Sequence, residues 1–225
     1  MTKILLDFFF PQKCLRCEKG GALICKECLD IMPETENTAE NIHNPYAIPT
    51  IVASCYKNEI IKKAIWLLKY KKIKTIAGPL SELLFNRCIE DLSEINTFYH
   101  IKECLVIPIP VSKIKLRERG FNQAELIAIN LTETLASNMP TINFSFEKNI
   151  LKKIRETSSQ VLMKDKAKRL KNLKGSFKAE HPEKVKGRNI ILIDDVSTTG
   201  ATIYEASSVL KKAGARLIIP IVVAR

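Results

Sequence analysis

The hydrophobic residues of this chain recur at helical spacing in three segments. Between positions 58 and 70 they fall three or four residues apart, which predicts an amphipathic helix. A second helix is predicted to start at Asn122, because an asparagine followed three residues later by Glu125 is a common helix start. A third should run from Thr202 to a terminating Gly214.

Apolar runs that are too short for helices alternate with these segments. Residues 105–107 form a short run ended by Pro108 and Pro110, which cannot donate hydrogen bonds to a sheet. Residues 189–193 and 217–224 are longer runs, as expected for strands covered on both faces. Because strands alternate with helices, the predicted fold class is α/β, with a largely parallel sheet flanked by helices.

The first part of the chain differs from this alternating region. Residues 30–49 are polar, contain three prolines and show no period, which predicts a surface linker. We therefore expect an N-terminal arm, a cysteine module and a linker at 1–48, and the α/β domain at 49–225. No apolar run approaches the roughly 20 residues that span a bilayer, and no cleavage site follows the apolar start. We therefore expect neither membrane insertion nor a signal peptide.

Four of the seven cysteines form a C-x2-C-x7-C-x2-C pattern. Two residues between cysteines let both sulfurs turn toward one ion, and two such pairs supply the four-sulfur set that structural zinc prefers. The candidate zinc ligands are Cys14, Cys17, Cys25 and Cys28. The alternative is two redox-active or disulfide pairs. The remaining cysteines are expected to be buried in apolar surroundings; they are Cys55, Cys88 and Cys104.

The chain is strongly basic. Its 36 lysines and arginines outnumber 24 acids, which gives a formal net charge of +12. Such a charge favours polyanionic partners, either nucleic acid or phosphorylated small molecules. The basic residues concentrate at 57–74 and 148–178, although a solvated basic face without a ligand is the alternative for either segment.

A pair of acids follows the apolar run at 189–193. Asp194 and Asp195 would lie at the carboxyl end of that strand, where open α/β sheets bind ligands. The next residues before the predicted helix are Ser197, Thr198, Thr199, Gly200, Ala201 and Thr202. Small residues let several amides point inward, and the helix N-terminus adds positive charge, so this loop can hold a phosphate. Two carboxylates beside a phosphate suit a sugar phosphate; the alternative is a strand-turn-helix with solvated acids.

Residues 190–202 resemble the signature of type I phosphoribosyltransferases, which bind phosphoribosyl pyrophosphate (PRPP). Over most of its length the chain more closely resembles the ComF (ComFC) family, which is associated with natural transformation. That likeness includes the cysteine module, the stretches at 68–71, 107–111, 119–124 and 155–160, Arg169 with Asn172, and the final strand. Residues 75–103 and the linker contribute little to it.

The resemblance implies a role for each matching residue. Asp194 and Asp195 would be the catalytic residues and contact the ribose hydroxyls, and the loop at 197–202 would bind the 5-phosphate. Lys69, Tyr70 and Lys71 would contact the pyrophosphate, and Mg²⁺ would arrive bound to PRPP. The basic stretch near 152–175 resembles a hood that closes over PRPP. The domain at 49–225 would then be a type I phosphoribosyltransferase-like domain.

Three functions are compatible with these features. The first is a cytoplasmic, PRPP-binding phosphoribosyltransferase with an unknown acceptor, which handles imported single-stranded DNA in natural transformation. The second is a non-catalytic single-stranded-DNA-binding factor on the same fold, with a helicase-like competence protein as a candidate partner. The third is a PRPP-sensing regulator. The candidate DNA-binding residues are Lys152, Lys153, Lys164 and Lys168, whereas Trp66 is expected to lie in the core.

Overall fold

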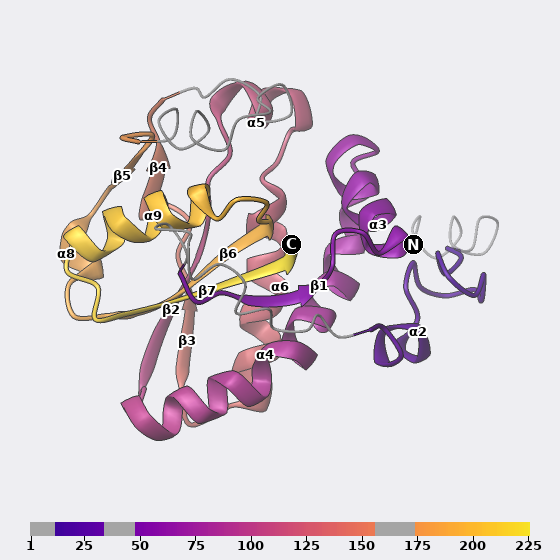
Figure 1. The fold of residues 1–225 in the computed structure, drawn as a ribbon, viewed down its shortest axis with the longest axis horizontal. Helices are drawn as coiled ribbons and strands as arrows, with labels where there is room; N and C mark the ends of the chain where they lie inside the picture. Colours follow the sequence, from indigo (N-terminus) through magenta and orange to yellow (C-terminus); the bar gives the residue numbers. More distant parts are fainter. Residues whose placement is uncertain (1–11, 34–47, 156–173) are drawn as a thin grey trace, which may run out of the picture.

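The computed structural model describes residues 12–33, 48–155 and 174–225, and these form an α/β fold around one parallel sheet (Figure 1). All four pairs of neighbouring strands in this sheet run parallel, which confirms the predicted fold class. In spatial order the strands are β1 (Ile51–Ser54), β7 (Leu217–Ala224), β6 (Asn189–Val196), β2 (Glu103–Pro108) and β3 (Asn143–Phe146).

Helices cover both faces of the sheet. On one face α4 (Ala77–Tyr99) packs on β1 and β7, and α6 (Gln123–Asn138) packs on β2, β3 and β6. On the other face α9 (Ala201–Lys212) packs on β6 and β7. The helix α3 (Glu59–Tyr70) follows β1. The smaller elements are α2 (Lys26–Asp30), η1 (Lys74–Ile76), α5 (Lys113–Arg119), α8 (Pro182–Val185) and an antiparallel hairpin of β4 (Leu151–Lys153) and β5 (Phe177–Ala179).

The central strand β6 shows why this sequence forms a two-sided core. Ile191 and Ile193 belong to the apolar cluster under α4 and α6, whereas Ile190 and Leu192 belong to the cluster under α9. Alternate residues of a strand point to opposite faces, so an apolar residue is required at every position. The strand continues to Val196, three residues beyond the predicted end.

The predicted helix starts are confirmed at two asparagines. The side chain of Asn58 accepts hydrogen bonds from the amides of Ile60 and Ile61, and that of Asn122 accepts one from Ala124. Glu125 does not complete a capping box, because it forms an ion pair with Lys148 instead, at 3.1 Å. These caps fix where α3 and α6 begin, and therefore which of their residues reach the edge of the sheet.

The long helix α4 was not predicted, and it connects the cysteine module to the sheet. The Ser81 hydroxyl donates to the carbonyl of Ile127 at 2.9 Å, which joins α4 to α6. Arg87 donates to the carbonyl of Met32, at the end of the cysteine module, at 2.5 Å. Ile24 and Leu29 of that module are buried in the same apolar cluster as α4. The predicted boundary at 48/49 stays a prediction. Within the described ranges, no helix combines the length and apolar content needed to cross a membrane.

Candidate functional site

The two acids lie in the last residues of β6, at the carboxyl edge of the sheet. The prediction placed them after the strand; in the structure they are still paired within it, since Asp194 is opposite Val222 of β7. Asp195 is 3% exposed and Asp194 is half-buried. The amide of Asp195 donates to Oδ1 of Asp194 at 2.8 Å, so the Asp194 carboxyl group is held against the main chain of Asp195.

Asp195 lies in a network of polar side chains from three helices. Its Oδ2 forms a buried ion pair with Nζ of Lys69, from the last turn of α3. Its Oδ1 accepts from Nε2 of Gln123 at 3.4 Å, and Arg119 in turn donates to Oε1 of Gln123 at 2.9 Å. The end of α3, the end of α5 and the start of α6 therefore meet at one carboxylate.

The network gives the two acids opposite pKa shifts. Burial and the adjacent Asp195 carboxylate raise the pKa of Asp194 well above its ordinary value. Burial also opposes ionisation of Asp195, but attraction and hydrogen bonding from Lys69 outweigh it and lower the pKa of Asp195. Burial would lower the pKa of Lys69, yet Asp195 raises it on balance. The site thus holds one firmly ionised carboxylate, matched by Lys69, beside a second carboxyl group that resists ionisation.

The loop after β6 leads directly into a helix N-terminus. The amide of Ser197 donates to the carbonyl of Ala224 at 3.0 Å, which fixes the start of the loop to β7. Gly200 has φ +76°, a left-handed conformation that favours glycine, and it caps α9. The hydroxyl of Thr199 accepts from the amide of Ala201 at 3.4 Å. The N-terminus of a 12-residue helix such as α9 carries amides without intrahelical partners and a partial positive charge, which is the chemistry that an anion site uses.

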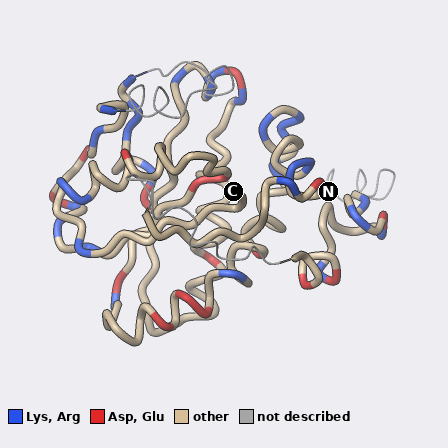
Figure 2. Tube along the Cα trace, viewed as in Figure 1, with Lys and Arg blue, Asp and Glu red and all other residues tan. Residues whose placement is uncertain are grey.

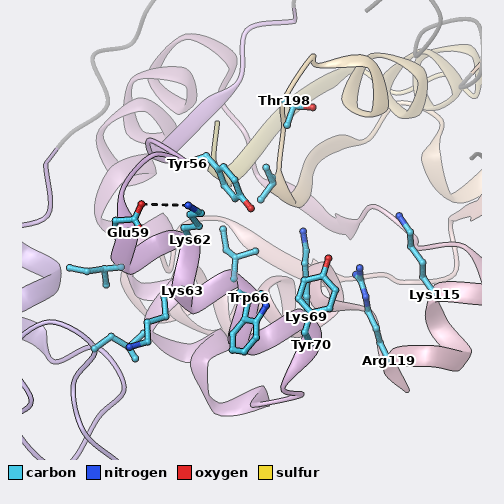
Figure 3. Close-up of a pocket in the computed structure, with 14 residues that line it drawn as sticks. Tyr56, Glu59, Lys62, Lys63, Trp66, Lys69, Tyr70, Lys115, Arg119 and Thr198 are labelled. Atoms are coloured by element: carbon cyan, nitrogen blue, oxygen red, sulfur yellow. Dashed lines mark hydrogen bonds and ion pairs between the residues drawn. The ribbon is translucent and has the colours of Figure 1, made fainter. Parts of the chain in front are cut away.

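Two adjacent cavities open at this edge of the sheet, with volumes of about 810 Å³ and 130 Å³. The smaller cavity contains the acids and is lined by Lys69, Ile109, Pro110, Val111, Ser112, Lys115, Arg119, Gln123, Lys153, Asp194, Asp195, Val196 and Thr202. The larger is lined by Leu15, Tyr56, Glu59, Ile60, Lys62, Lys63, Ile65, Trp66, Lys69, Tyr70, Lys115, Arg119, Val196 and Thr198. In Figure 3, Tyr56 and Thr198 lie across the larger cavity from Lys69 and Arg119.

The structure brings only part of the expected pyrophosphate group to the acids. Lys69 reaches Asp195, whereas Tyr70 is 62% exposed and lines the larger cavity. Lys71 is the C-cap residue of α3, and its Nζ lies 5.3 Å from the centre of the Trp66 ring. The three residues end α3 rather than forming a separate loop, so they point in different directions around its last turn.

The candidate DNA-binding lysines do not form one group. Lys153 lines the smaller cavity beside the acids, while Lys152 is exposed and lies 3.5 Å from Glu180. Lys164 and Lys168 lie outside the described residues, as does most of the predicted hood. Among the described residues, lysines and arginines recur on α3, on α5 and around the hairpin of β4 and β5, and acids gather along α4 (Figure 2).

Three residues at the site were given no role by the sequence prediction. Lys115 and Arg119 of α5 line both cavities, and Gln123 of α6 contacts Asp195. Burial, followed by repulsion from Arg119 and Lys69, lowers the pKa of Lys115. Arg119 and Gln123 belong to the stretch at 119–124 that resembles the ComF family, so the signal for two of the three was present.

The four N-terminal cysteines form a compact cluster. Their sulfur atoms all lie within 4.8 Å of one another, so the set could hold a metal ion. Three are buried, and the amide of Cys25 donates to the sulfur of Cys14 at 3.5 Å. Burial opposes ionisation of Cys14, but hydrogen bonds from the amides of Cys17, Cys25 and Arg16 outweigh it and lower its pKa to about 6. A thiolate stabilised in this way is the form that binds metal.

Two expectations about burial are wrong. Cys88 and Cys104 are buried as predicted, but Cys55 is exposed because it follows β1 at the edge of the larger cavity's wall, next to Tyr56. Trp66 is 45% exposed rather than in the core. The buried stripe of α3 consists of Ile61, Ala64, Ile65 and Leu68, and Trp66 lies beside this stripe, facing the larger cavity.

The pKa shifts give a stability prediction for Asp194→Asn. Asparagine keeps an oxygen for the Asp195 amide but removes a carboxyl group whose ionisation the folded state disfavours. The pKa of Asp194 is raised in the folded chain, whereas an aspartate in the unfolded chain has a pKa of about 3.9. As pH rises, the unfolded chain therefore loses the Asp194 proton at a lower pH than the folded chain does. At neutral pH the free energy of unfolding should therefore be higher for the variant than for the wild type.

This gain should be absent below the unfolded pKa, grow as pH rises through it, and level off above the folded pKa. Urea unfolding at a series of pH values measures it. Asp30→Asn, which changes an exposed residue at the end of α2, is the matched control and should lack this profile. A stability gain that is largest at acidic pH would contradict the raised pKa of Asp194.

Comparison with known proteins gives one consistent result. The phosphoribosyl transferase domain family matches residues 135–225. The DNA utilization protein YhgH of Escherichia coli O157:H7 is 30% identical over 208 residues, which cover 91% of this chain and 85% of that protein. Competence protein F of Haemophilus influenzae is 36% identical over 110 residues, 48% of this chain and 44% of that protein.

Competence protein ComFC of Bacillus subtilis is 37% identical over 122 residues, which cover 54% of this chain and 44% of that protein. The shorter alignments thus span under half of these two relatives, whereas the alignment with YhgH spans most of both chains. With this likeness, the parallel sheet and the clustered N-terminal cysteines, the chain belongs to the ComF (ComFC) family and contains a phosphoribosyltransferase domain.

Proposed function

We propose that this chain is a PRPP-binding, phosphoribosyltransferase-like protein that handles imported single-stranded DNA in the cytoplasm during natural transformation. The observation that supports PRPP binding most strongly is the acid pair at the end of β6, directly beside a phosphate-type loop and the N-terminus of α9. The names of the relatives, competence proteins and DNA utilization proteins, support the cellular role.

The charges around the acid pair suit the parts of PRPP. The loop at 197–202 would bind the 5-phosphate, and Asp194 and Asp195 would accept hydrogen bonds from the ribose hydroxyls. Lys69, Lys115 and Arg119 line the cavity that contains the acids, where they would meet the pyrophosphate. Mg²⁺ would arrive with PRPP, because it keeps water and phosphate oxygens as ligands, and it would offset the charge of the leaving pyrophosphate.

Lys69 would change partners when PRPP binds. In the structure its ammonium group is matched by Asp195, which offsets the cost of burying both charges. A pyrophosphate beside Lys69 would compete for the ammonium group and leave Asp195 available to the ribose hydroxyls. Ligand binding and the opening of this ion pair would therefore be one event.

The same groups suit phosphoribosyl transfer to an acceptor. Transfer would break the bond between C1 of the ribose and a pyrophosphate oxygen, with the electron pair leaving on pyrophosphate, while an acceptor nucleophile bonds to C1. Carboxylates near the sugar stabilise the positive charge that develops there, and the lysines stabilise the leaving group. The alternatives are a DNA-binding platform without turnover and a PRPP-sensing regulator. Retention of transformation by cells that carry Asp194→Asn would favour the platform.

We further propose that Cys14, Cys17, Cys25 and Cys28 hold a structural zinc ion. Four sulfurs complete the tetrahedral set of such a site and leave no open position for chemistry. Because Ile24 and Leu29 of this module are buried in the main core, the ion would stabilise the wall of the larger cavity as well as the module.

Metal analysis of the wild type and of a cysteine variant tests this proposal. Elemental analysis should find about one zinc ion per chain, and Cys25→Ser should lose it and lower the melting temperature, because structural zinc contributes roughly 10 kcal/mol or more of apparent binding free energy. Cys55→Ser, an exposed cysteine outside the cluster, is the control and should keep the zinc. A metal-free chain that is fully folded would rule the zinc site out.

Calorimetry with Mg-PRPP tests the sugar-phosphate site. Asp195→Ala and Thr199→Val should each weaken binding by at least about tenfold, because each removes a hydrogen-bonding group worth roughly 1.5 kcal/mol or more to a charged ligand. Thr141→Val, exposed at the opposite edge of the sheet, should leave the affinity unchanged. Lys69→Ala should weaken PRPP more than ribose 5-phosphate, since only PRPP has a pyrophosphate. Unchanged PRPP affinity in all three site variants would place the ligand elsewhere.

Salt dependence tests the binding of single-stranded DNA. Removing charge at Lys152, Lys153, Lys164 and Lys168 should lower the affinity for an oligothymidylate. The affinity should also become less sensitive to salt. The slope of log affinity against log salt concentration should become shallower by about 0.7 for each phosphate that a lysine no longer neutralises. The matched control removes equal charge at the opposite edge of the sheet, at Lys102, Lys186, Lys211 and Lys212. Asp194→Asn should abolish PRPP binding and leave the affinity for the oligothymidylate intact. An absent or salt-insensitive interaction would exclude the DNA proposal.

A further inference from the structure

The larger cavity is lined by aromatic and basic side chains that have no role in the proposed PRPP site. At about 810 Å³ it lies in the size range of pockets that enclose whole small molecules. Its walls come from α3 and α5, from Leu15 of the cysteine module, from Tyr56 after β1, and from Val196 and Thr198 at the end of β6. Lys69, Lys115 and Arg119 line both cavities, so the larger one continues directly from the space beside the acids.

Aromatic rings are unusually exposed in this cavity. Trp66 is 45% exposed and Tyr56 is 39% exposed. Aromatic side chains of this size usually contribute to stability by burying their large apolar area. Trp66 and Tyr70 lie with ring centres 6.5 Å apart and planes tilted by 41°. The buried stripe of α3 packs without Trp66, which leaves this side chain 45% exposed. The ammonium group of the exposed Lys71 lies 5.3 Å from the centre of the ring, so a flat ligand would stack on the remaining exposed area or displace this lysine.

The rest of the lining is positively charged. Lysines and an arginine from α3 and α5 face the cavity, and Figure 3 shows Lys62 and Lys63 near Trp66 and Lys115 and Arg119 beyond Tyr70. Among the described residues that line it, Glu59 is the single acid, and Lys62 lies 3.5 Å from its carboxylate. A ligand that fits this wall combines flat apolar rings with several negative charges.

We propose that the larger cavity binds an unpaired nucleobase of single-stranded nucleic acid, stacked on Trp66, with the flanking phosphates on Lys63, Lys115 and Arg119. This inference rests on the proposed DNA function and locates the contact that distinguishes single strands from duplexes. A duplex keeps its bases stacked on one another, whereas a single strand can present the whole face of a base to an aromatic side chain. A phosphate ion alone would need no exposed aromatic wall.

The chain contains one tryptophan, so its fluorescence reports on this cavity alone. A fluorescein-labelled oligothymidylate measures binding by anisotropy, and tryptophan emission is followed in a parallel titration with the unlabelled strand. The emission should be quenched in proportion to the bound fraction. Inorganic polyphosphate and a blunt duplex of the same length should leave most of the emission unquenched at saturation.

Variants test the stacking contact by anisotropy. Trp66→Ala should weaken oligothymidylate binding by about 5- to 150-fold, the range that corresponds to 1–3 kcal/mol for one stacked base. Trp66→Phe should restore most of the affinity, because it keeps an aromatic face. Phe98→Ala, exposed at the far end of α4, is the control and should bind as the wild type does. Thermal unfolding checks that Trp66→Ala is folded, as expected for a half-exposed side chain.

The outcomes separate this inference from the proposed function. If the labelled strand binds but tryptophan emission and the Trp66→Ala affinity are unchanged, the nucleobase pocket is wrong and the DNA function stands. Equal quenching by inorganic polyphosphate would reduce the cavity to an anion site and overturn the inference. If no strand binds, both the pocket and the DNA function fail. PRPP calorimetry is independent of all three results.

Discussion

The buried ion pair between Lys69 and Asp195 is the interaction around which the site is organised. Two charges removed from water destabilise a protein unless each is matched, so the last turn of α3 must stay against the end of β6. Burial raises the pKa of Asp194, and the pair adds to this shift because it leaves Asp194 beside the negative charge of Asp195. Gln123 and Arg119 extend the same network to α6 and α5. One contact thus aligns three helices and sets the charge state of both acids.

The rest of the fold supplies the rigidity that this contact needs. β6 is apolar on both faces from Ile190 to Ile193, and polar residues replace the core directly after Ile193, at the carboxyl edge. Its neighbours β7 and β2 hold it in register on either side. The loop at 197–200 is fixed to β7 at its start and ends in the cap of α9. The acids and the loop therefore have little freedom to separate.

The sequence was sufficient for the elements whose signals are local. The periodicity of α3, the Asn122 cap and the apolar runs of β6 and β7 each depend on a few neighbouring residues. The helix α4 has a mixed face, and β1 and β3 are four residues long, so their signals are weak. Lys115 was missed for another reason. Its helix α5 buries none of its residues, and only tertiary packing brings this lysine to the cavity that contains the acids.

The exposure of Trp66 shows where a periodicity argument stops. Helical spacing places this residue next to the apolar stripe, and a tryptophan at such a position is more often buried than exposed. Whether it is buried depends on whether another element covers that side of α3, and here the space between α3 and α5 stays open. Three cations on the border of this space, Lys69, Lys115 and Arg119, also face the acids. If both proposed ligands bind, they share this positive charge, so each must change the affinity for the other by the same factor.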